Sequence, residues 1–180
     1  MSKKSVFVIF LLCLFILSSF LIAEAKTVVK YGHVGPPVHP QHKAALAFAK
    51  YVNDKTKGEI EIQVFPLGQL GAERSMTEQV QTGTLHMTAV TSGVLSNFVP
   101  EMGIIELPFI YPDRETAYKV LDDKEILERF TKFCDAKGFV FIGYTENEFR
   151  DISNSKRPIH KPEDLKGLKI RVIESPVFID

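Results

Sequence analysis

The chain has 180 residues, of which 45% are hydrophobic, and its 22 Lys and Arg balance 22 Asp and Glu to a net charge of zero. This hydrophobic content, which includes 14 Phe, is enough for a packed core and excludes an intrinsically disordered chain. The balanced charge excludes a global bias toward nucleic acid or an anionic membrane surface.

The first 25 residues have the pattern of a secretory signal peptide. Two lysines precede an apolar run over 6–17, and the small residues of the A-x-A sequence at 23–25 provide a cleavage site. We therefore expect cleavage before Lys26 and a periplasmic mature chain. An uncleaved membrane anchor is the alternative, because the apolar character continues toward Ile22 and approaches the length of about 18–20 residues that spans a bilayer.

After the predicted cleavage site, strand-like and helix-like patterns alternate with short connections. Alternating apolar and polar residues predict the strands, and apolar residues at helical spacing, ended by Gly58 and Gly83, predict the helices. This order favours an α/β layer with a parallel sheet, because parallel strands need crossover helices on their faces. The predicted elements are a strand at 27–34, a helix at 39–57, a strand at 59–65, a helix at 73–82 and a strand at 86–90.

The second part of the chain carries two more predicted helices and less regular segments. Residues 104–110 (IIELPFI) predict an extended buried segment, because an internal Pro disfavours a central strand. Residues 139–145 (FVFIGYT) predict a continuous apolar strand covered on both faces. Short strands and turns follow, with a crossing into a second lobe near 145–150. The predicted units are helices at 114–121 and 124–137, a signal peptide at 1–25, a first lobe at 26–147 and an incomplete second lobe at 148–180.

Two arginines lie in short apolar stretches that resemble strands. Arg150 follows a Phe, and Arg171 lies between an Ile and a Val. A guanidinium keeps its proton and is unfavourable on an apolar strand unless an anion meets it. Two such groups facing one cleft would bind a carboxylate through charge-assisted hydrogen bonds. The alternative is that both are exposed and pair with Asp151 or Glu174.

Three segments resemble the periplasmic substrate-binding subunit of the TRAP transporters, the DctP family. They are GQLGAERSMTEQVQTGTLHM, LPFIY and NEFRDISNSKRPIHKPEDLKGLKIRVIESPVF, in that order. The resemblance covers essentially the whole mature chain. It implies a periplasmic-binding-protein-like fold and a secreted receptor that passes a small organic acid anion to the small and large membrane subunits of a sodium-coupled importer.

The resemblance also implies a set of ligand-binding residues. Arg171 corresponds to the arginine of the LKxRV motif that makes the main salt bridge to the ligand carboxylate, and Arg150 to an assisting arginine. Glu73 corresponds to an acidic residue at the cleft rim, although a carboxylate at a helix start is also favoured by the helix dipole. The remaining implied residues are Thr91 and Ser92, which could donate hydroxyl hydrogen bonds or form a plain turn, and His33.

The sequence offers little support for a metal site or for catalysis. His33 has His39 and His42 nearby, but the spacing lacks a carboxylate or cysteine partner, so we expect no metal and no cofactor. The chain contains no G-x-S-x-G, H-E-x-x-H or P-loop motif, and Cys134 in a predicted helix is expected to be core. A hydrolase or isomerase, and a solute receptor of another transporter or sensor system, are the alternative functions.

Family members have two lobes of comparable size, which need roughly 250–300 residues at ordinary domain sizes. This chain is therefore expected to hold a first lobe and the opening of a second, as in a truncated product. The identity of the acid does not follow from the sequence, because C4-dicarboxylates, other short carboxylic acids and sugar acids all present a carboxylate.

Overall fold

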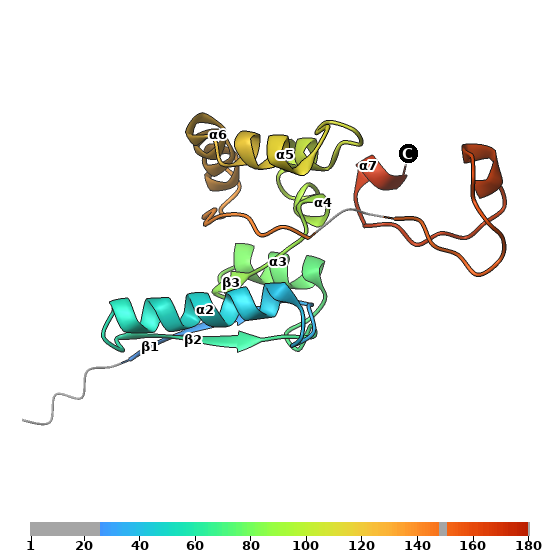
Figure 1. Cartoon of the computed structure of the whole chain (residues 1–180). Coiled ribbons are helices and arrows are strands. Elements are labelled where there is room, and N and C mark those ends of the chain that lie inside the picture. The colour runs from blue at the N-terminus through green and yellow to red at the C-terminus, as the bar shows by residue number, and fades with distance from the viewer. Residues whose placement is uncertain (1–25, 148–150, 180) are drawn as a thin grey trace, which may run out of the picture.

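The computed structural model describes residues 26–147 and 151–179, so the predicted signal peptide and Arg150 lie outside the described residues. Strands and helices alternate in the first part of the chain (Figure 1). Several helices follow, and an extended C-terminal segment ends with the short helix α7. The elements are β1 (Thr27–Gly32), α2 (Pro40–Lys55), β2 (Ile60–Phe65), α3 (Glu73–Gln81), β3 (Met87–Thr88), α4 (Ser92–Leu95), η1 (Pro100–Glu106), α5 (Arg114–Leu121), α6 (Lys124–Asp135), η2 (Pro162–Leu165) and α7 (Pro176–Ile179).

The three strands form one parallel sheet in the order β2-β1-β3. Strand β1 pairs along its whole length with β2, from Thr27 opposite Ile60 to Gly32 opposite Phe65. On its other side it pairs with only the two residues of β3, where Gly32 lies opposite Thr88. The predicted α/β layer with a parallel sheet is confirmed, although the third strand is shorter than the predicted 86–90.

Helix α2 packs against β2, and α3 packs against β3. The connection β1-α2-β2 and the connection β2-α3-β3 run in opposite directions across the sheet. Because such connections are right-handed, α2 and α3 lie on opposite faces of the sheet. Met76 of α3 is fully buried against Gly32 of β1. A Cβ atom at position 32 would lie 2.6 Å from the Sδ atom of Met76, so the glycine lets α3 approach the sheet closely.

The helix boundaries follow local signals in the sequence. The Asp123 carboxylate begins α6 by accepting hydrogen bonds from two backbone amides, and the Asp113 carboxylate caps α5 in a similar way. Gly83 follows the end of α3 with a φ of 76°, a backbone conformation that suits glycine. The predicted helices at 73–82 and 114–121 are confirmed. In the part of the chain that the structure describes, no helix is long and apolar enough to cross a bilayer.

The main hydrophobic core lies beside the sheet, between η1, α6 and the chain that follows α6. Its buried members are Val99, Met102, Phe130, Cys134 and Phe139. Burial raises the pKa of the Cys134 thiol, with smaller contributions from nearby acidic side chains. The prediction that Cys134 is a core residue is confirmed.

The segment 139–145, predicted as a strand, is not one in the structure. Phe139, Phe141 and Tyr144 do pack in the core, and the ring of Tyr144 stands edge-on to Phe130 with centroids 6.3 Å apart. However, Val140 and Ile142 are exposed, and the described residues supply no neighbouring strand to pair with this backbone. The prediction of a strand covered on both faces is therefore wrong, both in the pairing of the backbone and in the burial of Val140 and Ile142.

The predicted segment at 104–110 is also wrong. Its first residues belong to the 3-10 helix η1, and Phe109 is fully exposed with a φ of 62°. The short strands expected at 149–153 and 168–173 are not found in the described residues of those segments, which are 151–153 and 168–173. Instead, the side chain of Asn154 accepts hydrogen bonds from the amides of Lys156 and Arg157, at 2.8 and 3.0 Å, and holds a turn.

We predict that Met76→Ala destabilises the fold by about 2–5 kcal/mol, because it leaves a cavity between α3 and β1. Leu46→Ala on α2 is the matched control, since Leu46 is half exposed and the same change should cost well under about 1 kcal/mol. Urea denaturation followed by circular dichroism measures both. Equal loss in the two variants would contradict the packing described here.

Candidate functional site

The candidate site lies at the carboxyl ends of β1 and β3, the edge of a parallel sheet where ligands collect in open α/β folds. Thr91 and Ser92 follow β3 and lead directly into the short helix α4. His33 follows β1 at the same edge. The fold thus brings three of the predicted site residues to one side of the sheet, because neighbouring parallel strands end together.

Glu73 joins this group through a side-chain hydrogen bond. It is the first residue of α3, and its Oε1 accepts a hydrogen bond from the Thr91 hydroxyl at 3.0 Å. Both side chains are half-buried. The structure therefore places Glu73 beside Thr91, which lies 18 residues later in the sequence. The Glu73 carboxylate is also favoured at this position by the dipole of α3.

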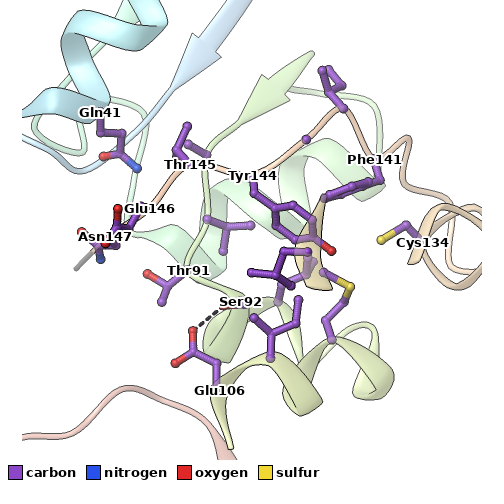
Figure 2. A pocket seen from close by; sticks show the side chains of 18 of the residues that line it. Gln41, Thr91, Ser92, Glu106, Cys134, Phe141, Tyr144, Thr145, Glu146 and Asn147 are labelled. Carbon is purple, nitrogen blue, oxygen red and sulfur yellow. Dashed lines mark hydrogen bonds between the residues drawn. The ribbon is translucent and has the colours of Figure 1, made fainter. Parts of the chain in front are cut away.

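A second carboxylate, that of Glu106, lies beside Ser92 and was not predicted from the sequence. The Ser92 hydroxyl donates to Oε1 of Glu106 (Figure 2). The same oxygen accepts from the Gly93 amide at 3.2 Å. Glu106 ends η1 and is half-buried. The available signal was an acidic residue inside the apolar run IIELPFI, where a charge is costly unless hydrogen-bonded.

Thr91, Ser92 and Glu106 border a cavity of about 1170 Å³ that extends from the end of β3 to the chain after α6, whereas Glu73 is not among its lining residues. One end is polar, and Figure 2 shows Thr91, Ser92 and Glu106 there, with Gln41, Glu146 and Asn147 nearby. The other end is apolar and aromatic, with Phe141 and Tyr144. Polar groups at one end of an apolar cavity are typical of a small-molecule site that fixes the orientation of its ligand.

The charged lining of the cavity is mainly acidic. Among its described lining residues, Glu106, Asp113, Asp122 and Glu146 carry negative charge and Arg114 carries positive charge. The Arg114 guanidinium pairs with Glu146 at 2.8 Å, and both side chains are partly exposed. This wall therefore offers an incoming anion little positive charge.

His33 is fully buried at the end of β1. Its Nε2 lies 3.0 Å from Nδ1 of His42 on α2, while its own Nδ1 has no hydrogen-bond partner among the described residues. Burial lowers the pKa of His33, and the nearby His42 lowers it further. His33 joins β1 to α2 rather than lining the cavity, and the described residues hold no group of three or more His, Cys, Asp or Glu placed for a metal ion.

Arg171 is exposed and does not line the cavity. Its segment is nevertheless anchored at the polar end, because the buried Ile173 packs on Gly93 of α4. The Asn97 side chain donates to the Glu174 carbonyl at 2.6 Å, which fixes the same segment. Two residues of chain span at most about 7 Å, so the Arg171 backbone lies within that distance of Ile173.

Comparison with known proteins gives one consistent result. The family model of the bacterial extracellular solute-binding proteins, family 7 (DctP), matches residues 31–180. A solute-binding protein of Verminephrobacter eiseniae is 47% identical over 157 residues, covering 87% of this chain and 47% of the relative. The chain spans about half the length of the curated relatives it matches.

Solved structures show the same similarity. A TRAP periplasmic solute-binding protein from a Polaromonas species, bound to D-erythronate, matches with a TM-score of 0.80 and 39% identity, covering 84% of this chain and 50% of that one. A TRAP periplasmic solute-binding protein from Sulfurospirillum deleyianum, with bound succinate, matches with a TM-score of 0.78 and 35% identity, covering 84% and 49%.

We predict that the chain loses stability as the pH falls through the titration range of His33. The pKa of His33 is lowered in the folded state, so between that value and the unfolded value of about 6.5 the unfolded chain binds more protons. Stability should therefore fall as the pH drops below about 6.5 and level off below the lowered pKa.

Urea denaturation midpoints between pH 5 and pH 8 measure this effect. His33→Gln should weaken the pH dependence, whereas His160→Gln, at an exposed position, should leave it as in the unmodified chain. An unchanged slope in His33→Gln would show that this imidazole is not the responsible group.

Proposed function

Because the chain belongs to family 7 of the bacterial extracellular solute-binding proteins, we propose that it is the periplasmic receptor of a TRAP-type transporter. It captures a small organic acid, such as a C4-dicarboxylate or a related carboxylate, through an arginine–carboxylate salt bridge. The membrane permease subunits are its partners, and the predicted signal peptide directs it to the periplasm. A solute receptor of another transporter or sensor system is the alternative.

The observation that best supports this proposal is the anchoring of the Arg171 segment at the polar end of the cavity. Ile173 packs on Gly93, next to Ser92, and the buried hydroxyls of Ser175 and Ser96 lie 3.3 Å apart. These contacts fix the chain two residues after Arg171. A guanidinium held there can reach a solute that also touches the end of β3.

The charges of the cavity wall support a role for this arginine in the proposed capture. The wall is mainly acidic, and its Arg114 already pairs with Glu146. Among the described lining residues, acidic side chains therefore outnumber basic ones. Arg171, assisted by Arg150, supplies positive charge, and a planar guanidinium can bind a carboxylate with two parallel hydrogen bonds.

Capture depends on removing water around the ion pair. A charge-assisted pair is weak in open solvent and strengthens as the local dielectric falls. Closure of a second lobe over the cavity would exclude water and give the closed form that the membrane subunits recognise.

The described residues give no support to a hydrolase or isomerase. Cys134 borders the cavity, but it is buried and burial raises the pKa of its thiol, which opposes formation of a nucleophilic thiolate. The protein is therefore proposed to be a receptor without catalytic activity.

We predict that Arg171→Gln strongly weakens binding of both succinate and D-erythronate. Removing one partner of a desolvated charge pair costs about 2–5 kcal/mol, which is roughly a 30-fold or greater rise in Kd. Isothermal titration calorimetry of the chain, with thermal denaturation as a second measurement, tests this.

Lys169→Gln is the matched control, because it removes a positive charge from an exposed position two residues earlier in the same segment. It should change the Kd less than about threefold, as expected for a surface charge. Equal effects of the two substitutions would assign the contribution of Arg171 to net charge alone and would contradict a direct salt bridge.

A further inference from the structure

The segment that follows Arg171 is held at the end of α4 by a pair of buried hydroxyls. Ser175 is 0% exposed and Ser96 is 8% exposed. The Ser96 hydroxyl donates to the Gly93 carbonyl at 2.6 Å, and the two serine hydroxyl oxygens lie 3.3 Å apart. A serine hydroxyl has one proton and two acceptor lone pairs. Because the proton of Ser96 is used on Gly93, the hydrogen bond between the two serines runs from Ser175 to Ser96.

Close packing surrounds this hydrogen bond. A Cβ atom at position 93 would lie 3.0 Å from Cγ2 of Ile173 and 3.4 Å from Cβ of Ser175, so the glycine lets the segment approach α4 closely. The Ser175 amide donates to the Ile173 carbonyl at 2.8 Å, and the Asn97 side chain donates to the Glu174 carbonyl at 2.6 Å. The turn at 173–175 is therefore fixed both within itself and against the first part of the chain.

Helix α4 connects this contact to the cavity. Its first residue, Ser92, lines the cavity, and the Ser96 amide donates to the Ser92 carbonyl at 2.9 Å, which holds the two serines one helical turn apart. Arg171 precedes Ser175 by four residues, a chain length of at most about 14 Å. The distance between the Arg171 backbone and the end of β3 therefore depends on how Ser175 is held.

We propose that Ser175 is a positioning residue for carboxylate capture, because its hydrogen bond to Ser96 sets the place of Arg171 relative to the end of β3. This inference rests on the proposed function, in which Arg171 binds the solute carboxylate. Ser175 does not line the cavity, so it acts only through the arginine. Holding the segment in place before the solute arrives lowers the ordering cost of binding.

The direction of the hydrogen bond gives an asymmetric expectation for stability, measured by urea denaturation. Ser96→Ala leaves the buried hydroxyl of Ser175 without an acceptor, whereas Ser175→Ala leaves Ser96 still donating to Gly93. The unfolding equilibrium constant should therefore rise at least about fivefold more in Ser96→Ala than in Ser175→Ala. The double variant should lose less stability than the sum of the two single variants, because no hydroxyl is then left unpaired. Equal losses in the two single variants would overturn the assigned hydrogen bond.

Calorimetric titration of the chain with D-erythronate and with succinate tests the positioning role. Ser175→Ala should raise the Kd of the acid that binds by about five- to tenfold, because the arginine is then less well placed. Thr131→Ala is the matched control. It also removes a hydroxyl that is not fully exposed, one that donates to the Leu127 carbonyl at 2.8 Å on α6, outside the cavity lining. The control should leave the Kd unchanged.

A mutant cycle with Arg171→Gln separates positioning from a general loss of structure. If Ser175 acts through the guanidinium, Ser175→Ala should change the Kd less than about twofold once Arg171 is replaced. A general loss of folded chain would raise the Kd by the same factor with and without the arginine, and that result would overturn the inference. An unchanged Kd in Ser175→Ala alone would also overturn it. Failure of both acids to bind the unmodified chain would instead overturn the proposed function.

Discussion

The structure depends on one central strand that pairs on both of its edges. Strand β1 pairs with β2 along its full length and with β3 at its last two residues. The first crossover begins at β1, and the second ends at β3, the neighbour of β1. The carboxyl end of β1 therefore lies at the polar end of the cavity. Gly32, at that end, has no side chain and lets Met76 bring α3 against the sheet. The position of Glu73, at the start of α3, follows from this contact.

The helices were predictable and several strands were not, for a physical reason. The caps of α5 and α6 and the glycine after α3 act within a few residues, so a single sequence contains the complete signal. A strand requires a partner, and no local pattern shows whether one is adjacent. The segment 139–145 has the composition of a buried strand, yet the described chain places no strand beside it. The 3-10 helix η1 was missed because Pro108, which indicated an extended segment, lies just beyond the end of that helix.

The site residues also divide into those that the sequence could predict and those that only the fold reveals. Thr91 and Ser92 follow a predicted strand, and parallel topology alone places them at the ligand edge. Glu106 escaped prediction because its partner Ser92 lies 14 residues earlier, and only the fold reveals that η1 turns back onto α4. The imidazole of His33 is buried and lies against His42, and His33 is not among the residues that line the cavity. The sequence indicated residue types suited to binding, and tertiary packing determined which of them line the cavity.

Side chains of opposite charge lie in two neighbouring segments of the described chain. Acceptors and carboxylates gather at the end of β3, and the segment anchored by Ile173 carries a guanidinium. A uniformly positive cleft would bind any small anion in several orientations, whereas a cleft of two signs binds an anion in one orientation only.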